Sequence, residues 1–262
     1  MNNVNKTLYI PLYGKALVSK KGIIINDSKA EEIWNKVGFE LKRKSKSKWL
    51  AYYMSMRASV FDNWVKEKLS ENKNVLVLHI GCGLDSRVER INAKNILWYD
   101  IDFEDVISER KKYYKENEHY NMSTGDAKNP EWIYNLPKNA DAIVILEGIS
   151  MYLKISEMEI LLKSISNHFN SSYILIDYYT TLSAKISKYK NPINDVGVTT
   201  VYGIDDPTIL NSNNITFIKE HSITPTEMIN QLTGLEKTIF KLLYAGKLSK
   251  KMYRLYEYSI NN

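Results

Sequence analysis

A glycine-rich turn and several carboxylates stand at comparable places in the middle of the chain, after short and mostly apolar segments. The run Val75–Ile80 leads directly into the turn 81–85, with sequence Gly-Cys-Gly-Leu-Asp. Later segments lead in the same way to Asp102, Asp126 and Glu147. In an open parallel sheet, ligands bind beyond the carboxyl ends of the strands. We therefore expect these residues to share one rim and to form a ligand site.

The residue types on this rim indicate what the ligand is. Glycine lets a backbone turn sharply and approach a ligand closely, and a carboxylate after the next strand can accept both hydroxyls of a ribose. A dinucleotide fingerprint needs a third glycine where this chain has Ser86, and Asp85 would repel a pyrophosphate. The pattern instead suits a cofactor that has an amine and a ribose but no phosphate, which is S-adenosylmethionine.

Each of these positions also has a purely structural interpretation. Gly81 and Gly83 are typical of an ordinary strand-to-helix turn, and Asp102 is a suitable helix N-cap. Asp126 is equally suited to a plain turn. Glu147 is the hardest to explain structurally, because it follows a buried apolar run.

Composition excludes several other classes of site. The chain has 262 residues and a formal net charge of +6, but its lysines are spread along the sequence, so we expect no nucleic-acid partner. The run from Lys42 to Lys48 is the densest basic patch. The single cysteine, Cys82, and four scattered histidines predict neither a disulfide nor a metal site. No apolar run reaches 18 residues and the first residues lack leader-peptide features, so we expect a cytoplasmic protein without a membrane partner.

Hydrophobic periodicity predicts an α/β protein. Residues 1–73 form a helical cap region, with a capping box at Ser28–Glu31 and helices near 31–41 and 57–69. Residues 74–262 form the α/β domain. Its buried strands are expected at 75–80, 95–99, 140–146 and 172–177, with helices at 104–114 and 157–169. A polar stretch surrounds Gly125. Two last strands, at 216–220 and 252–260, flank a helical stretch at 226–248, and the final strand has the alternation of an edge or antiparallel strand.

Three segments together resemble the leucine carboxyl methyltransferase family, which includes bacterial polyketide O-methyltransferases. They are 81–87 (Gly-Cys-Gly-Leu-Asp-Ser-Arg), 98–103 (Trp-Tyr-Asp-Ile-Asp-Phe) and 147–153 (Glu-Gly-Ile-Ser-Met-Tyr-Leu). Lys15, in Pro-Leu-Tyr-Gly-Lys, and Arg57 also fall where members have similar residues, and the resemblance covers roughly residues 9 to 260. It implies a Rossmann-like class I S-adenosylmethionine-dependent methyltransferase. Such a fold has a mostly parallel seven-stranded sheet, helices on both faces and an N-terminal helical cap.

The resemblance also implies roles for single residues. The turn 81–85 would line the methionine part of the cofactor, Arg57 would pair with its carboxylate, and Asp102 would hold the ribose. Asp126 would contact the adenine amine and Glu147 the amino group. We expect Cys82 to pack and Lys15 to be solvated. The complete set of expected cofactor-binding residues is Arg57, Gly81, Cys82, Gly83, Asp85, Asp102, Phe103, Asp126, Ala127, Glu147, Gly148 and Met151.

The expected reaction is methyl transfer to an oxygen of a small acidic or aromatic acceptor, either a carboxylate or a phenol, leaving S-adenosylhomocysteine. A carboxylate needs no general base, whereas a phenol needs one or a shifted pKa. Tyr152, Asp177 and Tyr178 are the candidate bases, although packing or capping explains each of them. The acceptor site is expected from the N-terminal helices and segment 180–207, with candidate residues Tyr179, Lys185, Lys188, Tyr189 and Lys190. A protein tail or tRNA as acceptor, and a non-catalytic cofactor-binding protein, remain alternatives. The oligomeric state stays open.

Overall fold

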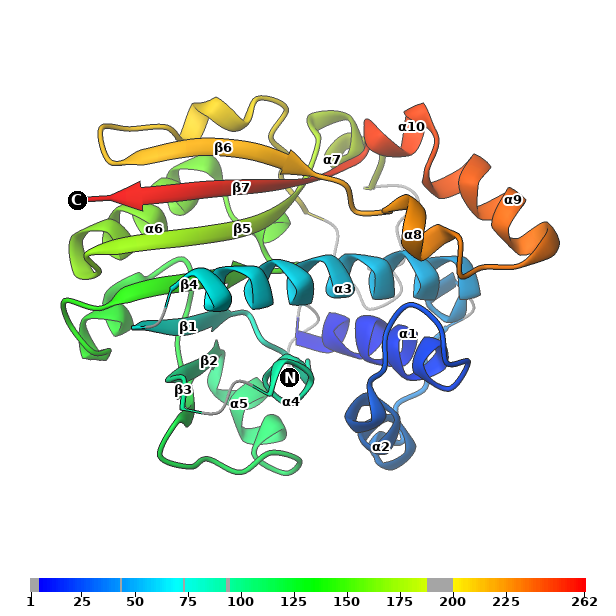
Figure 1. The fold of residues 1–262 in the computed structure, drawn as a ribbon, viewed down its shortest axis with the longest axis horizontal. Coiled ribbons are helices and arrows are strands. Elements are labelled where there is room, and N and C mark those ends of the chain that lie inside the picture. The colour runs from blue at the N-terminus through cyan, green and yellow to red at the C-terminus, as the bar shows by residue number, and fades with distance from the viewer. Residues whose placement is uncertain (1–4, 43, 73, 93–94, 188–199) are drawn as a thin grey trace.

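A seven-stranded sheet in the order β3-β2-β1-β4-β5-β7-β6 is the centre of the molecule (Figure 1). The computed structural model describes residues 5–42, 44–72, 74–92, 95–187 and 200–262. β7 is antiparallel to both of its neighbours, β5 and β6, and the other pairings are parallel. The strands are β1 (Val75–Ile80), β2 (Trp98–Asp102), β3 (Tyr120–Thr124), β4 (Asp141–Leu146), β5 (Ser171–Tyr179), β6 (Ile215–His221) and β7 (Tyr253–Asn261).

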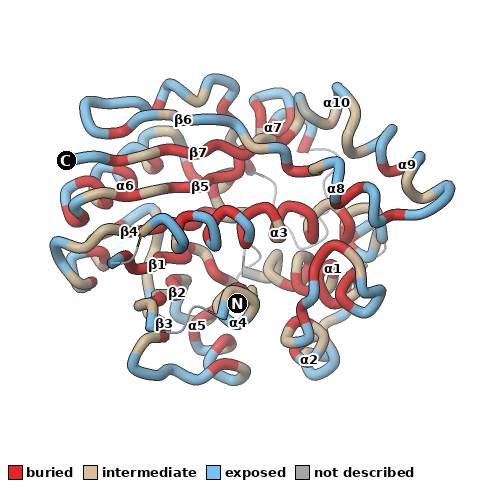
Figure 2. The backbone as a smooth tube through the Cα atoms, in the orientation of Figure 1, coloured by how far each residue is buried: buried red, intermediate tan, exposed pale blue. Residues whose placement is uncertain are grey.

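Both faces of the sheet are covered, because alternate residues of each strand enter two separate apolar clusters. On one face Val77 and Ile145 belong to a cluster with residues of the N-terminal helices. On the other face Leu78 and Val144 pack with residues of α6 (Ile155–His168). All of β1 is buried, which explains its continuous apolar sequence (Figure 2).

The N-terminal region consists of helices laid against the sheet. α1 (Tyr9–Ser19) and α2 (Ser28–Val37) are followed by the long α3 (Lys48–Glu71), which runs across the front of the sheet in Figure 1. The predicted helix 57–69 is therefore only the second half of α3. The predicted capping box is wrong by one residue, because Asp27 is the N-cap of α2 and accepts a hydrogen bond from the Ala30 N–H at 2.8 Å. Lys42, Lys44, Lys46 and Lys48 of the basic run are all exposed.

The remaining helices are short, and all of them except η1 and η2 lie between strands in the chain. Among the helices within the described ranges, none has both the length and the apolar character that crossing a bilayer requires. The α-helices are α4 (Arg87–Ile91), α5 (Glu104–Arg110), α7 (Thr181–Ser187), α8 (Thr226–Ile229), α9 (Gly234–Tyr244) and α10 (Lys247–Lys250). The 3₁₀ helices are η1 (Asn5–Leu8), η2 (Lys44–Lys46), η3 (Pro130–Asn135), η4 (Ser150–Tyr152) and η6 (Pro207–Leu210).

The predicted fold class is confirmed, with four corrections to its elements. The second strand is Trp98–Asp102 rather than 95–99, and the polar stretch before Gly125 contains β3. β7 is antiparallel as expected but lies inside the sheet, with β6 outside it. The helical stretch 226–248 is divided into α8, α9 and the start of α10.

Candidate active site

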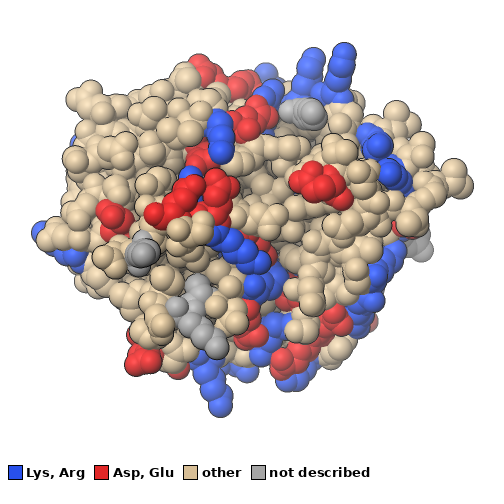
Figure 3. All heavy atoms as spheres, in the orientation of Figure 1, with Lys and Arg blue, Asp and Glu red and all other residues tan. Residues whose placement is uncertain are grey.

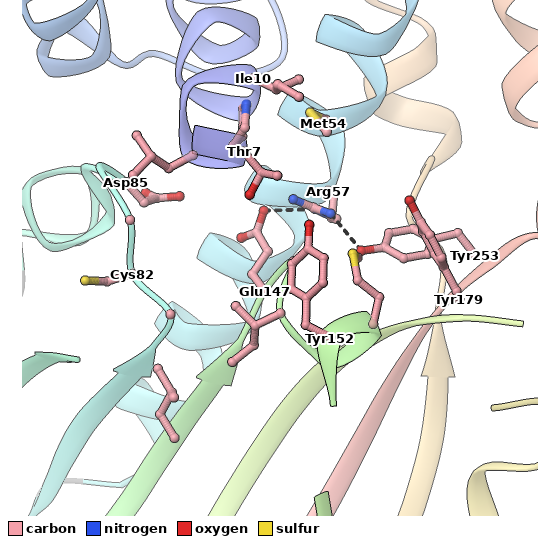
Figure 4. Close-up of a pocket in the computed structure, with 18 of the residues that line it drawn as sticks. Thr7, Ile10, Met54, Arg57, Cys82, Asp85, Glu147, Tyr152, Tyr179 and Tyr253 are labelled. Carbon is pink, nitrogen blue, oxygen red and sulfur yellow. Dashed lines mark hydrogen bonds and ion pairs between the residues drawn. The ribbon is translucent and has the colours of Figure 1, made fainter. Parts of the chain in front are cut away.

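A cavity of about 790 Å³ opens at the carboxyl ends of β1, β2, β3 and β4. Every expected cofactor-binding residue lines it, from Arg57 in α3 to Met151 in η4. Tyr152 lines it too, whereas Asp177 and Tyr178 do not. Figure 4 shows Arg57, Glu147 and Tyr152 meeting where α1, α3 and the strand ends converge.

The glycine turn after β1 requires glycine at its first position. Gly81 has a φ of +72°, and a Cβ placed there would lie 2.2 Å from Cγ2 of Ile149. Gly83 also has a positive φ, and its N–H donates to Asp102 at 2.8 Å. Cys82 is buried, and its side chain points away from Arg57 and Glu147 in Figure 4. Burial raises the pKa of this thiol well above its usual value, which agrees with a packing role.

Asp102 ends β2 with its carboxylate held by two backbone donors. One oxygen accepts from the Gly83 N–H and the other from the Phe103 N–H, both at 2.8 Å. Burial raises the pKa of Asp102 to about 6, even though these donors and Arg110 act in the opposite direction. Each oxygen keeps a further lone pair, so a ribose could still donate both of its hydroxyls.

Lys15 is the first site residue whose surroundings differ from expectation. It is only 3% exposed rather than solvated, and its Nζ lies 2.5 Å from Asp85 Oδ2. Arg90 contacts the other Asp85 oxygen at 2.9 Å. Burial acts to raise the pKa of Asp85, but Arg90, Lys15 and Arg87 hold it well below its usual range. A charged Asp85 therefore faces the cavity, in contact with Lys15.

Glu147 is held between two arginines. Its Oε1 accepts from Arg57 Nε at 3.0 Å, and its Oε2 accepts from Arg87. Burial opposes ionisation, but the two guanidinium groups lower the pKa of Glu147. Arg57 also contacts Asp177 and Tyr253, at 3.0 and 2.8 Å from its Nη1. The cavity thus has a fixed carboxylate next to a fixed guanidinium.

The two candidate bases outside the cavity have structural partners. Asp177 accepts hydrogen bonds from the Gly148 N–H at 2.8 and 2.9 Å and from the Tyr253 hydroxyl at 2.6 Å. It thereby ties the turn after β4 to β7. Tyr178 is buried against Tyr256, and its pKa is raised by burial. Neither side chain is placed to take a proton from a molecule in the cavity.

Asp126 both caps a turn and lines the cavity. Its Oδ1 accepts from the Lys128 N–H at 2.9 Å, and its Oδ2 accepts from Asn129 at 3.1 Å. Both interpretations of this residue, turn and ligand contact, are thus compatible with its position. Ala127 follows it at the cavity wall.

The far end of the cavity is apolar and rich in tyrosine. α7 contributes residues as expected, together with Tyr179, whereas Lys185 is exposed and does not line the cavity. Lys188, Tyr189 and Lys190 lie outside the described residues. The tyrosines and larger apolar side chains lining this end are Leu50, Tyr53, Met54, Tyr152, Leu153, Tyr179, Leu182, Ile186, Leu243, Tyr244, Leu248, Met252 and Tyr253.

Sequence reasoning missed three contributors to the site. Arg87 is fully buried and holds Glu147, although a surface arginine at a helix start has the same sequence appearance. Tyr253 contacts Arg57 from a strand that begins 100 residues after the last motif residue, Leu153. The segment from α9 to α10 lines the tyrosine-rich end of the cavity without any motif. Arg87 ends the segment 81–87, one of the three that carry the family resemblance, and this position was the only sequence indication of its role.

Comparisons with known proteins agree with this geometry. The model of the leucine carboxyl methyltransferase family matches residues 3–166. TcmP, the tetracenomycin polyketide synthesis O-methyltransferase of Streptomyces glaucescens, is 26% identical over 243 residues, covering 91% of this chain and 90% of TcmP. The S-adenosyl-L-methionine-dependent methyltransferase dpfgK of Gibberella zeae is 26% identical over 236 residues, covering 81% and 79% of the two chains.

Solved structures show the same fold at low identity. Magnesium protoporphyrin IX methyltransferase from Synechocystis, with bound S-adenosylhomocysteine, aligns with a TM-score of 0.54 at 13% identity over 90% of this chain and 95% of the other. A DUF574 family protein from Streptomyces avermitilis aligns with a TM-score of 0.61 at 9% identity over 89% and 90%. The sheet order, the site and the family match lead to one conclusion: this chain is an S-adenosylmethionine-dependent methyltransferase that belongs to the leucine carboxyl methyltransferase family.

Proposed function

We propose that this enzyme methylates a carboxylate oxygen of a small aromatic acid. The observation that carries the proposal is the division of the cavity into two unlike ends. Its lining carboxylates, Asp85, Asp102, Asp126 and Glu147, follow the strand ends, whereas the other end is lined by tyrosines and aliphatic side chains. The name of the relative TcmP, a polyketide O-methyltransferase, supports a small acceptor and an oxygen as the atom methylated.

The residues of the first end fit S-adenosylmethionine. Asp102 would accept the ribose hydroxyls, and the exposed ring of Phe103 beside it would offer an apolar surface to the adenine; both residues line the cavity. Glu147 and Asp85 are anionic partners for the amino group. Arg57 and Lys15, which already pair with carboxylates of the protein, are the cations that would also contact the carboxylate of the cofactor, and a guanidinium binds a carboxylate well. When bound, this cofactor supplies a methyl group on a positively charged sulfur, which an ionised acceptor oxygen displaces directly.

The tyrosine-rich end fits an aromatic acceptor. Tyr53 packs against Tyr244 and Tyr253, with ring centroids 5.7 and 6.4 Å apart, so this wall is held rigid. Tyr179 packs against Tyr253 at 5.0 Å. Rigid aromatic walls hold a flat acceptor in one orientation, and orientation is a large part of what the protein contributes to a displacement.

We choose a carboxylate over a phenol as the acceptor because the tyrosine-rich end of the cavity offers no group that could remove the proton of a phenol. Among the described residues lining it there is no aspartate, glutamate or histidine. Burial raises the pKa of Tyr152, Tyr53 and Tyr253, so all three stay protonated near neutral pH. A phenol would find no base among these groups, whereas a carboxylic acid is already ionised.

Matched acceptors test this proposal. Pairs of aromatic compounds that differ only in carrying a carboxylate or a phenol are incubated with the enzyme and cofactor labelled with tritium in the methyl group. Methyl esters lose their label as methanol in mild alkali, whereas methyl ethers do not. We expect alkali-labile label from the acids and none from the phenols.

Two other results would contradict the proposal. Alkali-stable label from the phenols would mean that a base exists and that the acceptor is a phenol. Label found only in tRNA or in a protein tail would mean that the acceptor is a macromolecule. Boiled enzyme and the Asp102→Asn variant serve as controls for chemical methylation.

A further inference from the structure

The outer side of α9 carries an apolar stripe that faces solvent. Leu235, Ile239 and Leu242 follow one another at helical spacing and are 79%, 38% and 79% exposed. Exposed leucines in a row on one helix face are unusual for a surface helix and mark an interaction site. Figure 2 shows α9 and α10 as mostly exposed, at the end of the molecule.

This stripe cannot turn inward, because the other side of α9 is already fixed to α3. Phe240 is fully buried, with its ring 6.3 Å from that of Tyr52. Glu236 accepts hydrogen bonds from Lys48 at 2.6 Å and from the Tyr52 hydroxyl at 2.7 Å. The outward direction of the leucines is therefore set by the packing of the helix.

The apolar surface continues to the acceptor end of the cavity. Leu243 and Leu248 are 56% and 71% exposed and also line the cavity. Leu182 and Ile186 of α7 do the same, at 47% and 43% exposed. A partner covering α9 and α10 would therefore lie beside the cavity mouth.

The charges on the segment that carries the stripe are almost all positive. Residues 234–251 contain five lysines and one glutamate, and that glutamate is Glu236, which pairs with Lys48. Lys241, Lys247 and Lys251 are exposed. In Figure 3, blue side chains lie on the mostly tan end of the molecule that carries α9 and α10, and a red patch lies beside this end, over α8. Leucines flanked by lysines complement a partner that has an apolar interior beneath a negatively charged outer layer.

We infer that α9 and α10 dock the enzyme on an anionic lipid surface, with the cavity mouth turned toward the lipid. Amphipathic helices of this composition bind in the plane of the membrane interface, where leucines enter the acyl boundary and lysines contact anionic headgroups. The lack of a long apolar run in the sequence argues against a helix that spans a bilayer. It does not argue against a helix that lies on the membrane surface, because such a helix needs only an apolar stripe.

A second copy of the chain fits this face less well. A two-fold contact through α9 would bring the same lysines of both copies together. Like charges facing each other in an interface cost binding free energy, whereas anionic headgroups compensate the same charges.

Sedimentation with vesicles tests the inference directly. The full chain is mixed with vesicles of phosphatidylcholine alone or of phosphatidylcholine with phosphatidylglycerol, without any acceptor. We expect the protein to sediment with the anionic vesicles only, and less of it as the salt concentration rises. Equal sedimentation with both vesicle types, or with neither, would overturn the inference.

Matched variants show whether the stripe is responsible. Leu235→Ser with Leu242→Ser should weaken the partitioning on the order of tenfold, because both leucines provide apolar area. Ile160→Ser, at a 52% exposed position on α6, is the control and should leave it unchanged. Thermal unfolding checks that both proteins are folded.

Measuring molecular mass in solution completes the test. A wild-type dimer that the double variant converts to a monomer, with no vesicle binding, would show that the face joins two copies and would overturn the inference. Since no acceptor or methyl transfer is involved, failure here leaves the proposed function untouched, and failure of the acceptor assay leaves this result untouched.

Discussion

At the scale of single residues, Asp102 combines an assigned role in ligand binding with a raised pKa. It is the acceptor we assign to the ribose, and burial raises its pKa to about 6. Two backbone N–H groups hold the carboxylate in place. Its protonation state in the free enzyme therefore changes close to neutral pH.

This pKa predicts pH-dependent cofactor binding. The ribose hydroxyls donate to the ionised carboxylate, so binding favours that form and lowers the pKa of Asp102. The affinity for S-adenosylhomocysteine should fall as the pH decreases through about 6, with proton release on binding near that pH. Calorimetric titrations in buffers of different ionisation enthalpy measure both effects. An affinity that stays constant down to about pH 5, with no proton release, would contradict this assignment.

The requirement for glycine at position 81 can be tested by substitution. An alanine there would combine a positive φ with a Cβ 2.2 Å from Ile149. We expect Gly81→Ala to lower the free energy of unfolding by roughly 2 kcal/mol or more in urea denaturation. Gly22→Ala is the matched control, with φ +65° and no atom within 4 Å of the added Cβ, and should cost about 1 kcal/mol. Equal losses in both variants would argue against crowding at Gly81.

At the scale of elements, α3 and α4 position the site through buried ion pairs. Asp62 of α3 binds Arg87 at 2.7 Å and Arg90 at 2.6 Å. These arginines in turn hold Glu147 and Asp85, which line the cavity. Asp62 itself does not line the cavity. It is therefore a positioning residue for carboxylates that it does not touch.

Replacing Asp62 should change cofactor binding without touching the cofactor. Asp62→Asn leaves two buried arginines short of negative charge, which typically costs about 3–5 kcal/mol of stability. With the protein still folded, we expect the affinity for S-adenosylhomocysteine to fall on the order of tenfold, because Glu147 and Asp85 lose their fixed positions. Calorimetry well below the melting temperature measures this. Reduced stability with unchanged affinity would show that Asp62 has only a structural role.

Elements with simple apolar patterns were predictable, and elements stabilised by buried polar groups were not. β1 and β4 are apolar except for His79 and Asp141, and their predicted bounds agree with the structure within one residue. β2 was misplaced because Asp100 lies inside it, fully buried and bound to Arg110 and Tyr120. A local pattern cannot show that an aspartate has distant partners that make its burial possible.

At the scale of the whole molecule, the N-terminal helices and the sheet share one core. Phe61 and Trp64 of α3 belong to the same apolar cluster as Val77 of β1 and Leu255 of β7. Lys15 and Arg57 also enter the cavity from this region. The cap is therefore part of the site as well as of the core.

This shared core predicts that the chain unfolds as one unit. Differential scanning calorimetry should show a single transition with equal calorimetric and van't Hoff enthalpies. S-adenosylhomocysteine at a hundred times its Kd should shift the whole transition upward, by about 2.7 kcal/mol in the free energy of unfolding. Two separate transitions, of which the ligand shifts only one, would instead show independent units at 1–73 and 74–262.

The residues at the strand ends could be predicted from the sequence, whereas the residues that pack around them could not. Gly81 and Glu147 directly follow strands and Asp102 ends one, so the topology of a parallel sheet brings them together. Lys15 and Tyr253 come from the two ends of the chain and depend on how α1 and β7 pack. Their burial results from tertiary contacts, which no local pattern records.

Calorimetric titration with S-adenosylhomocysteine tests the site most directly. The affinity of the wild type is compared with the affinities of the variants Asp102→Asn and Glu118→Gln. The side chain of Glu118 is 84% exposed, and the residue precedes β3, at the amino end of a strand whose carboxyl end adjoins the cavity. We predict that Asp102→Asn weakens binding roughly 10- to 100-fold, as expected for losing hydrogen bonds to a charged group, and that Glu118→Gln binds like the wild type. Wild-type affinity in Asp102→Asn would contradict the assignment of this rim as the cofactor site.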